Sequence, residues 1–373
     1  MPKTKILHII KSLGRGGAEM LLPETLQLHN KDKFEFHYIY FLPWKDQMVE
    51  AIENAGGYVK CFPAKNNIEL LLSVNKVVDY SKKNKINLIH AHLPWSGFLA
   101  RLVHKRTKIP VVYTEHNIQE RYHKLTKALN RLSFNWQSMA LGVSKDVSDS
   151  INSNIHVKIP VKTLLNGVNT QKFSRDMNAV KRIRDLYEIP ENALVVGNVA
   201  VFRKQKDLRT WVKAFRLISD GRPGVYGLLV GSGPQEEEIR DLIKDLNIQN
   251  LMLPGLQTDT IPYFSAMDIF MMSSEFEGLP VALLEAMSME CAVVSTKAGG
   301  VTEAVRNNKD GLLVDIGDVE ALAENSLRLL NNKEELQCFK ENARKRVVED
   351  FSLLNMVQNL EVHYYNILNS KLN

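Results

Sequence analysis

Short apolar runs alternate along the chain with longer amphipathic segments. In the first half of the chain, such runs lie at residues 5–10, 36–41, 86–92, 110–114 and 139–144. Continuous apolar runs that are bounded by helical patterns are typical of buried parallel strands in βα units. The first half is therefore predicted to form a doubly wound α/β domain.

A second series of apolar runs begins near residue 193. Its members lie at 193–202, 226–233, 250–255, 268–274, 291–296 and 311–316, and they again alternate with amphipathic helical patterns. A chain of 373 residues also exceeds the usual size of one hydrophobic core. We expect two Rossmann-like domains that face a central cleft, with ligands at the carboxyl ends of the strands.

The connection between the two series contains a turn at Asn166-Gly167 and then a charged helical pattern that ends near Pro190. We place the domains at residues 1–175 and 176–351. A last helical pattern, at 352–373, follows a break at 350–352 and could pack back on the first domain.

Charge is distributed unevenly between the halves. The formal net charge is +6, but residues 1–175 hold 26 Lys and Arg against 13 Asp and Glu, or +13, which leaves 6 − 13 = −7 for the rest. The basic half suggests an anionic partner such as a membrane surface, a lipid phosphate or a nucleic acid. A solvated basic surface without a partner is the alternative, and no aromatic and basic RNA motif supports nucleic acid.

The sequence carries no signal for export or for spanning a membrane. Its amino terminus runs directly into a strand pattern without a signal-peptide segment, and no run approaches 18 apolar residues. The widely separated Cys61, Cys291 and Cys338 suggest reduced thiols. We expect a cytoplasmic protein, with peripheral membrane attachment through the basic residues of 1–175 as an option.

The strongest local signal for chemistry is the segment 273–287. Gly278 gives a flexible turn, and Pro280 is predicted at the first helical position, so that N–H groups of the first turn can bind a diphosphate. Glu285 could then bind ribose hydroxyls, and Glu277 could reach a sugar. Alternatively, Glu277 only favours the helix dipole and Glu285 is a solvated helix residue.

Cations and glycines follow the neighbouring strand patterns. Arg203 and Lys206 could neutralise the diphosphate, although an exposed basic loop is the alternative. Gly231 and Gly233 could let the backbone approach a base or ribose, or could serve only close packing.

In the first half, Gly16 and Gly17 lie in the loop after the first strand pattern, with the same two interpretations. The strand ends at 90–92 and 115–117 supply His90, His92 and His116, each of which is by itself expected to be structural. No histidine has a zinc-like spacing with cysteine, and the chain has no Asp-x-Asp pair, so we expect neither a metal nor another cofactor.

In their order along the chain, these segments resemble the large retaining glycosyltransferase family 4, which has the GT-B fold. The resemblance rests on GGAE, HAH, TEHN, VSKDV, NGVNTQKF, FRKQKD, VGSGP, EGLPVALLEAM, AGGVTEAV and GLLV. The most specific of these is EGLP, which is followed by a second Glu.

The resemblance implies a role for each candidate residue. His116 would contact the sugar near the reaction centre, Glu277 the transferred sugar, Glu285 the ribose and Lys206 the phosphates. Gly16 and Gly17 would line the diphosphate and acceptor side of the cleft, and the phosphate turn would be formed by Gly278, Leu279, Pro280 and Val281. Two positions depart from the family pattern: Val201 stands where an arginine is usual, so Arg203 is the candidate substitute, and Asn169 replaces an aspartate.

The resemblance also implies a metal-independent reaction that retains the anomeric configuration. The acceptor hydroxyl would attack from the front face, and the leaving diphosphate would take its proton. A UDP-sugar donor, a glycan or lipid-linked acceptor and a role in surface polysaccharide biosynthesis are the corresponding expectations. A nucleotide-sugar epimerase or sugar phosphorylase of the same fold, or a non-catalytic sugar-nucleotide binding module, remains as an alternative.

Overall fold

The computed structural model describes residues 2–369 and divides the chain into two units. Unit 1 comprises the described residues up to Asn166 together with those from Leu353 on, and unit 2 comprises Gly167–Ser352. The segment from Gly167 to the expected boundary at 175 belongs to unit 2. It is held there because the Val168 N–H donates to the Phe351 carbonyl at 2.9 Å and Arg344 donates to the Thr170 carbonyl at 2.9 Å.

Unit 1 is built on a parallel seven-stranded sheet with the order β3-β2-β1-β4-β5-β6-β7. The strands are β1 (Thr4–Ile9), β2 (Phe34–Tyr40), β3 (Tyr58–Cys61), β4 (Leu88–His92), β5 (Val111–Glu115), β6 (Met139–Gly142) and β7 (Val161–Thr163). The helices are α1 (Gly17–Leu28), α2 (Val49–Asn54), α3 (Asn67–Leu72), α4 (Val74–Lys83), α5 (Pro94–Thr107), α6 (Lys124–Ser133), α7 (Lys145–Asn154) and α16 (Leu353–Asn369). All five predicted strands are present.

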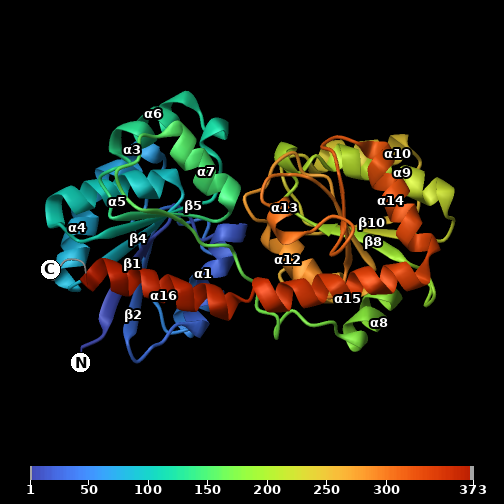
Figure 1. Ribbon diagram of the computed structural model, residues 1–373, viewed down its shortest axis with the longest axis horizontal. Coiled ribbons are helices and arrows are strands. Elements are labelled where there is room, and N and C mark those ends of the chain that lie inside the picture. The colour runs from blue at the N-terminus through green and yellow to red at the C-terminus, as the bar shows by residue number, and fades with distance from the viewer. Residues whose placement is uncertain (1, 370–373) are drawn as a thin grey trace. The chain divides into compact units, whose positions relative to one another are not determined.

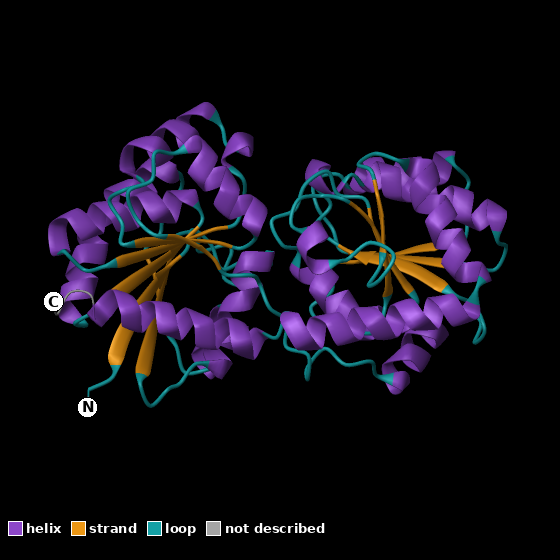
Figure 2. Cartoon of the chain, viewed as in Figure 1, coloured by secondary structure: helices purple, strands orange, loops and turns teal. Residues whose placement is uncertain are grey.

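Helices cover both faces of this sheet, and the strand order reverses between β1 and β4 (Figures 1 and 2). The carboxyl-terminal helix α16 belongs to unit 1 and packs against α1. Its Glu361 accepts a 2.9 Å hydrogen bond from His29 just after α1, and its Tyr364 hydroxyl lies 2.6 Å from His90 Nδ1. The last residues of the expected 352–373 helix, 370–373, lie outside the described residues.

Unit 2 has a parallel six-stranded sheet with the order β10-β9-β8-β11-β12-β13. The strands are β8 (Val195–Val199), β9 (Tyr226–Val230), β10 (Leu251–Gly255), β11 (Ile269–Met272), β12 (Ala292–Thr296) and β13 (Leu312–Val314). The helices are α8 (Met177–Leu186), α9 (Leu208–Gly221), α10 (Glu236–Asp245), α11 (Ile261–Ala266), α12 (Val281–Ser288), α13 (Val301–Ala304), α14 (Val319–Asn331) and α15 (Lys333–Asp350). The prediction of two doubly wound domains is confirmed.

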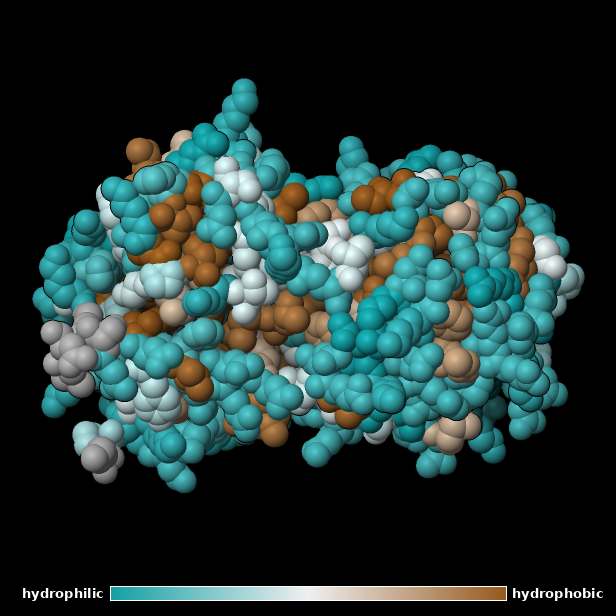
Figure 3. All heavy atoms as spheres, viewed as in Figure 1, coloured by the Kyte–Doolittle hydropathy of each residue, from teal (hydrophilic) through white to brown (hydrophobic). Residues whose placement is uncertain are grey.

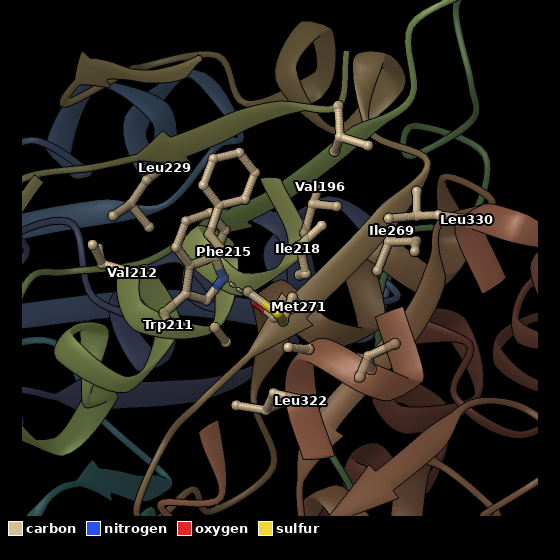
Figure 4. Close-up of a cluster of buried hydrophobic side chains, with 14 of the residues drawn as sticks. Val196, Trp211, Val212, Phe215, Ile218, Leu229, Ile269, Met271, Leu322 and Leu330 are labelled. Atoms are coloured by element: carbon tan, nitrogen blue, oxygen red, sulfur yellow. Dashed lines mark hydrogen bonds between the residues drawn. The ribbon is translucent and has the colours of Figure 1, made fainter. Parts of the chain in front are cut away.

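The core of unit 2 fixes the strands that carry the candidate site. Trp211 on α9 is fully buried beside Phe215, and its Nε1 donates a 2.8 Å hydrogen bond to the Met271 carbonyl on β11 (Figure 4). This bond satisfies the one polar group of the indole inside an otherwise apolar cluster. This contact attaches helix α9 to β11. Because α9 follows the loop after β8, that loop is held beside the loop after β11.

Among the described residues, no helix is long and apolar enough to cross a membrane. Cys61, Cys291 and Cys338 are free thiols, and Cys291 is fully buried.

Candidate functional site

The candidate site of unit 2 lies where its strand order reverses. Strands β8 and β11 are neighbours, yet the chain leaves β8 for β9 and leaves β11 for β12, so their carboxyl ends form the crevice in which open α/β sheets bind ligands. Lys206 comes from the loop after β8 and Glu277 from the loop after β11. Their side chains form a 2.6 Å ion pair.

Hydrogen bonds join these two loops. The Gln205 side-chain amide donates to the Phe276 carbonyl at 2.8 Å, and the Glu275 N–H donates to the Gln205 carbonyl at 2.9 Å. The buried Ser273 hydroxyl is 3.0 Å from the carbonyl of Lys206. These bonds between the loops therefore fix the backbone around Lys206 and Glu277.

Glu277 is buried, with 5% of its surface exposed. Its Oε1 accepts from Lys206 and also from the Ser274 hydroxyl at 2.6 Å. Within the described residues, its Oε2 makes no hydrogen bond, so this oxygen can accept from a ligand hydroxyl. The partnership with Ser274 was missed in the sequence, because a serine after a strand carries no distinctive signal.

Helix α12 starts at Val281, one residue later than expected. Pro280 is the N-cap rather than the first helical residue, because its ψ of 118° is extended. Proline offers no capping side chain, and no side chain of the described residues caps this helix. The N–H groups of its first turn are therefore available to an anion, and Gly278 and Leu279 lead into that turn.

Glu285 lies further along α12 and is 6% exposed. The interpretation of this residue as a solvated helix position is wrong, because α12 packs this face into unit 2. A carboxylate that stays this buried must be matched by polar partners. Glu285 therefore has the burial expected of a binding residue.

The other candidates of unit 2 lie around the same crevice. Arg203 is exposed at the start of the short 3-10 helix Lys204–Lys206, and its guanidinium makes no ion pair among the described residues. Gly231 has φ +129°, and a Cβ there would lie 1.9 Å from the Ala200 carbonyl oxygen. At Gly233 a Cβ would lie 2.6 Å from the Phe202 carbonyl oxygen. Close packing therefore accounts for both glycines.

A third loop, after β12, touches the Glu277 backbone. Gly299 has φ +57°, and its missing Cβ would lie 2.2 Å from the Glu277 carbonyl oxygen. The Gly300 N–H donates to that same carbonyl at 3.2 Å. The loop at 298–300 thus packs against the Glu277 backbone and helps to fix its position.

Gly16, Gly17 and His116 belong to unit 1, at the carboxyl ends of its strands. Gly16 is the N-cap of α1 and Gly17 is its first residue, in the loop after β1. His116 directly follows β5, and its Nε2 has no partner among the described residues. Burial lowers the pKa of His116 to about 4, so the imidazole is neutral at pH 7.

The buried Glu115 holds the loop that carries His116. It accepts hydrogen bonds from the Tyr113 hydroxyl at 2.8 Å, the Gln119 amide at 2.7 Å, the Tyr122 hydroxyl and the His116 N–H at 3.0 Å. Burial raises the pKa of this carboxyl, and the hydrogen bonds oppose that shift. Sequence reasoning singled out the TEHN segment but not this role of Glu115.

Three buried histidines on β1 and β4 of unit 1 are close enough to hold a metal ion. One ring nitrogen each from His8, His90 and His92 lies within 4.8 Å of the others. The rings already bond one another and their surroundings, since His8 Nδ1 is 3.0 Å from His92 Nε2, and both His90 nitrogens have hydroxyl partners. Neutral hydrogen-bonded rings therefore account for most of the cluster, and burial lowers the pKa of His90 to about 3.

Each of the two units matches a model of a known protein family. A family model described as Glycosyl transferases group 1 matches residues 180–346, and one described as Glycosyltransferase Family 4 matches residues 15–172. The N-acetyl-alpha-D-glucosaminyl L-malate synthase of Bacillus anthracis is 26% identical over 306 residues, which cover 80% of this chain and 79% of that protein.

Two further similarities extend over nearly the whole chain. The UDP-Gal:alpha-D-GlcNAc-diphosphoundecaprenol alpha-1,3-galactosyltransferase of Escherichia coli is 23% identical over 388 residues, covering 99% of this chain and 98% of that one. The crystal structure of Anabaena Alr3699/HepE in complex with UDP-glucose superposes with a TM-score of 0.88 at 21% identity, covering 97% of this chain and 99% of that one. The structural likeness establishes the GT-B fold.

Proposed function

Because this chain belongs to glycosyltransferase family 4, within the group 1 glycosyl transferases, we propose that it moves a sugar from a UDP-sugar to an acceptor hydroxyl with retention of configuration. Family membership makes the protein a glycosyltransferase. The proposal for the donor rests on the Lys206–Glu277 ion pair, which lies where the strand order of the unit 2 sheet reverses. A cation for the diphosphate and a carboxylate for the sugar lie side by side there.

The donor site of unit 2 follows from this pair. Lys206, Arg203 and the N–H groups of the first turn of α12 bind the diphosphate. Glu277 Oε2 accepts from the transferred sugar, and the buried Glu285 accepts from the ribose. The UDP-glucose complex of Alr3699/HepE and the UDP-Gal donor in the name of the Escherichia coli relative support UDP as the carrier.

The residues of unit 2 supply charge stabilisation rather than a nucleophile. As the glycosidic bond to phosphate breaks, negative charge grows on the diphosphate, and the preorganised cations and N–H groups stabilise it. The acceptor hydroxyl attacks on the face that the diphosphate leaves, and the diphosphate takes its proton. The neutral His116 contributes a hydrogen bond to the sugar, and the reaction proceeds without a metal.

The acceptor is a glycan or lipid-linked hydroxyl, and the setting is surface polysaccharide biosynthesis at the cytoplasmic face of a membrane. The name of the Escherichia coli relative specifies a diphosphoundecaprenol-linked acceptor. The net charge of +13 on residues 1–175 suits attachment to an anionic membrane surface.

A thermal-shift screen tests the donor assignment. The protein is heated with UDP-, GDP- and ADP-sugars in EDTA, and ligand binding to the native state raises the melting temperature. We expect UDP-sugars to stabilise the protein and Glu285→Ala to lose that response. Glu324→Ala, which changes an exposed glutamate on α14, is the matched control and should respond like the parent. Stabilisation by another nucleotide class, or an equal response of Glu285→Ala, would contradict the proposal.

A further inference from the structure

Helix α6 of unit 1 buries polar side chains and exposes apolar ones, which is the reverse of an ordinary surface helix. Its most buried side chains are the polar Thr126 and Asn130. Its Leu125 and Leu132 are 56% and 74% exposed. A helix that packs on an apolar core buries its leucines, so this apolar face is turned toward something other than the core.

A buried polar network fixes the helix in this orientation. Asn130 Oδ1 accepts from Arg101 Nη1 at 3.0 Å, and Asn130 Nδ2 donates to Gln119 Oε1 at 2.9 Å. Arg101 is fully buried and stacks over the Tyr113 ring at 4.9 Å. Rotating α6 to bury its leucines would break these bonds inside the protein, which makes the exposed face a stable feature of the fold.

Helix α3 adds a second pair of exposed apolar side chains. Ile68 and Leu72, four residues apart on one face of α3, are 70% and 73% exposed. Both α3 and α6 pack against α5. In the space-filling view, apolar surface is visible over this part of unit 1 (Figure 3). We call the exposed side chains of α3 and α6 the apolar face.

The charges on α6 and on the last turn of α5 are all positive, and Glu69 on α3 is an acidic residue beside the apolar face. Helix α6 carries Lys124, Lys127 and Arg131 and no acidic residue. The last turn of α5 carries His104, Lys105 and Arg106. The Lys105 ammonium lies 4.8 Å from the ring centre of Trp136, which is itself partly exposed just after α6. Leucines flanked by cations and an aromatic ring are the composition of helices that lie in a membrane interface.

We infer that the apolar face docks on an anionic lipid bilayer, with Leu125 and Leu132 inserted among the lipids and the lysines at the headgroups. A second copy of this chain is a poorer occupant, because a symmetric contact would bring the same cations together. A bilayer with anionic headgroups matches both the leucines and the charges. This inference rests on the proposed lipid-linked acceptor, which would be reached from the membrane surface.

Vesicle co-sedimentation of the full chain tests the inference. The probes are phosphatidylcholine vesicles with and without about one third phosphatidylglycerol, a composition chosen to supply the negative surface potential. We expect binding to the anionic vesicles and weak binding to the neutral ones. Lys124→Gln should lower the partition coefficient about fivefold. The double variant Leu125→Ser with Leu132→Ser should lower it by roughly tenfold.

A matched control is available on α16. Leu354 and Val362 are 45% and 54% exposed on a helix that has no lysine or arginine. Leu354→Ser with Val362→Ser should bind vesicles like the parent. Equal binding of the parent to neutral and anionic vesicles would overturn the inference. So would unchanged binding of the α6 double variant, or a parent dimer that this variant abolishes.

The donor screen separates this test from a failure of the proposed function. Stabilisation by UDP-sugars is measured on the parent and on the α6 double variant. Donor stabilisation without vesicle binding overturns the docking inference alone. Vesicle binding without donor stabilisation overturns the proposed function and leaves the docking surface in place.

Discussion

The Nζ of Lys206 lies 2.6 Å from Oε1 of Glu277, in loops that follow two neighbouring strands of unit 2. Because Glu277 is buried, each partner offsets the desolvation of the other. A bound diphosphate would share the lysine, while the carboxylate keeps Oε2 for the sugar. The pair thus links binding of the phosphates to the orientation of the residue that is proposed to hold the transferred group.

Glu277→Gln should lower the transfer rate about a hundredfold or more while the protein remains folded. The amide still accepts from Ser274 but removes the charge that faces Lys206. Lys206→Met leaves a buried carboxylate without its cation and should lower the free energy of unfolding by about 1–3 kcal/mol. UDP release and urea denaturation measure the two effects.

A surface ion pair provides the control for these variants. Arg240 and Glu236 are paired at 2.8 Å on α10, where both side chains are substantially exposed. Arg240→Gln should change the free energy of unfolding by less than about 0.5 kcal/mol and leave transfer unaffected. If Lys206→Met were as mild as Arg240→Gln in both assays, the role given to the pair would be wrong.

The sequence predicted most of the fold because buried parallel strands are continuous apolar runs. All six runs of the second half became strands, and so did the five of the first half. The strands β3 and β7 were missed because they leave side chains exposed, whereas the equally short edge strand β13 is largely buried. A strand without buried side chains lacks the apolar run that makes the pattern readable.

The candidate site was predictable where chemistry depends on residue type and spacing along the chain. Lys206 and Glu277 could be named in this way, but their contact depends on the order of strands in the sheet, which no local pattern specifies. Glu115 was noticed only as a strand-end residue, since its five hydrogen-bond donors lie at irregular spacings between Tyr113 and Tyr122. Irregular spacing of this kind leaves no periodic signal.

The positive φ of Gly231 and the closeness of Ala200 predict that Gly231→Ala will be severely destabilising. The new methyl group would overlap the Ala200 carbonyl oxygen, and the strained backbone adds to the cost, so we expect a loss of about 3 kcal/mol or more. Gly224 also has a positive φ, +85°, but its Cβ would meet nothing within 4 Å. Gly224→Ala should therefore cost only about 1 kcal/mol, and urea denaturation of both variants isolates the overlap.

Glu115→Ala should destabilise unit 1 by about 3 kcal/mol, because it leaves several buried donors without an acceptor. Glu115→Gln keeps an acceptor oxygen and should cost about half as much. If Glu115 positions His116, amide exchange across residues 116–122 should rise more in the alanine variant than in the glutamine variant. Transfer should fall in the same order, and equal activity of both variants would show that the loop is held by other contacts.

Metal removal should leave transfer unchanged, since the proposed charge stabilisation comes from cations of the chain and from N–H groups. Dialysis against EDTA followed by the UDP-release assay measures this. Metal analysis of the untreated protein checks the cluster of His8, His90 and His92 independently. A stoichiometric metal whose loss abolishes transfer would contradict the metal-independent mechanism.

Acid should unfold unit 1 before unit 2. Nine of the ten histidines lie within residues 1–175 and the tenth, His363, is on α16, so all of them belong to unit 1. Burial lowers the pKa of His90 to about 3 and that of His116 to about 4, whereas an unfolded histidine titrates near 6.5. Above about pH 6.5 these histidines are neutral in both states, and the free energy of unfolding is at its full value. As the pH falls from 6.5 toward 4, the unfolded histidines bind protons that the buried ones do not, so the free energy of unfolding decreases.

The size of the acid effect follows from these two groups. Each native histidine that stays neutral costs about 1.4 kcal/mol per pH unit below 6.5, so His90 and His116 together should remove about 2–3 kcal/mol between pH 6 and pH 5. The lowered pKa values of His8, His29 and His92 act in the same direction. Amide exchange, corrected for its intrinsic pH dependence, should therefore show protection falling in β1, β4 and β5 while β8 and β11 remain protected. Equal loss of protection in both units would mean that carboxylates rather than the buried histidines govern acid unfolding.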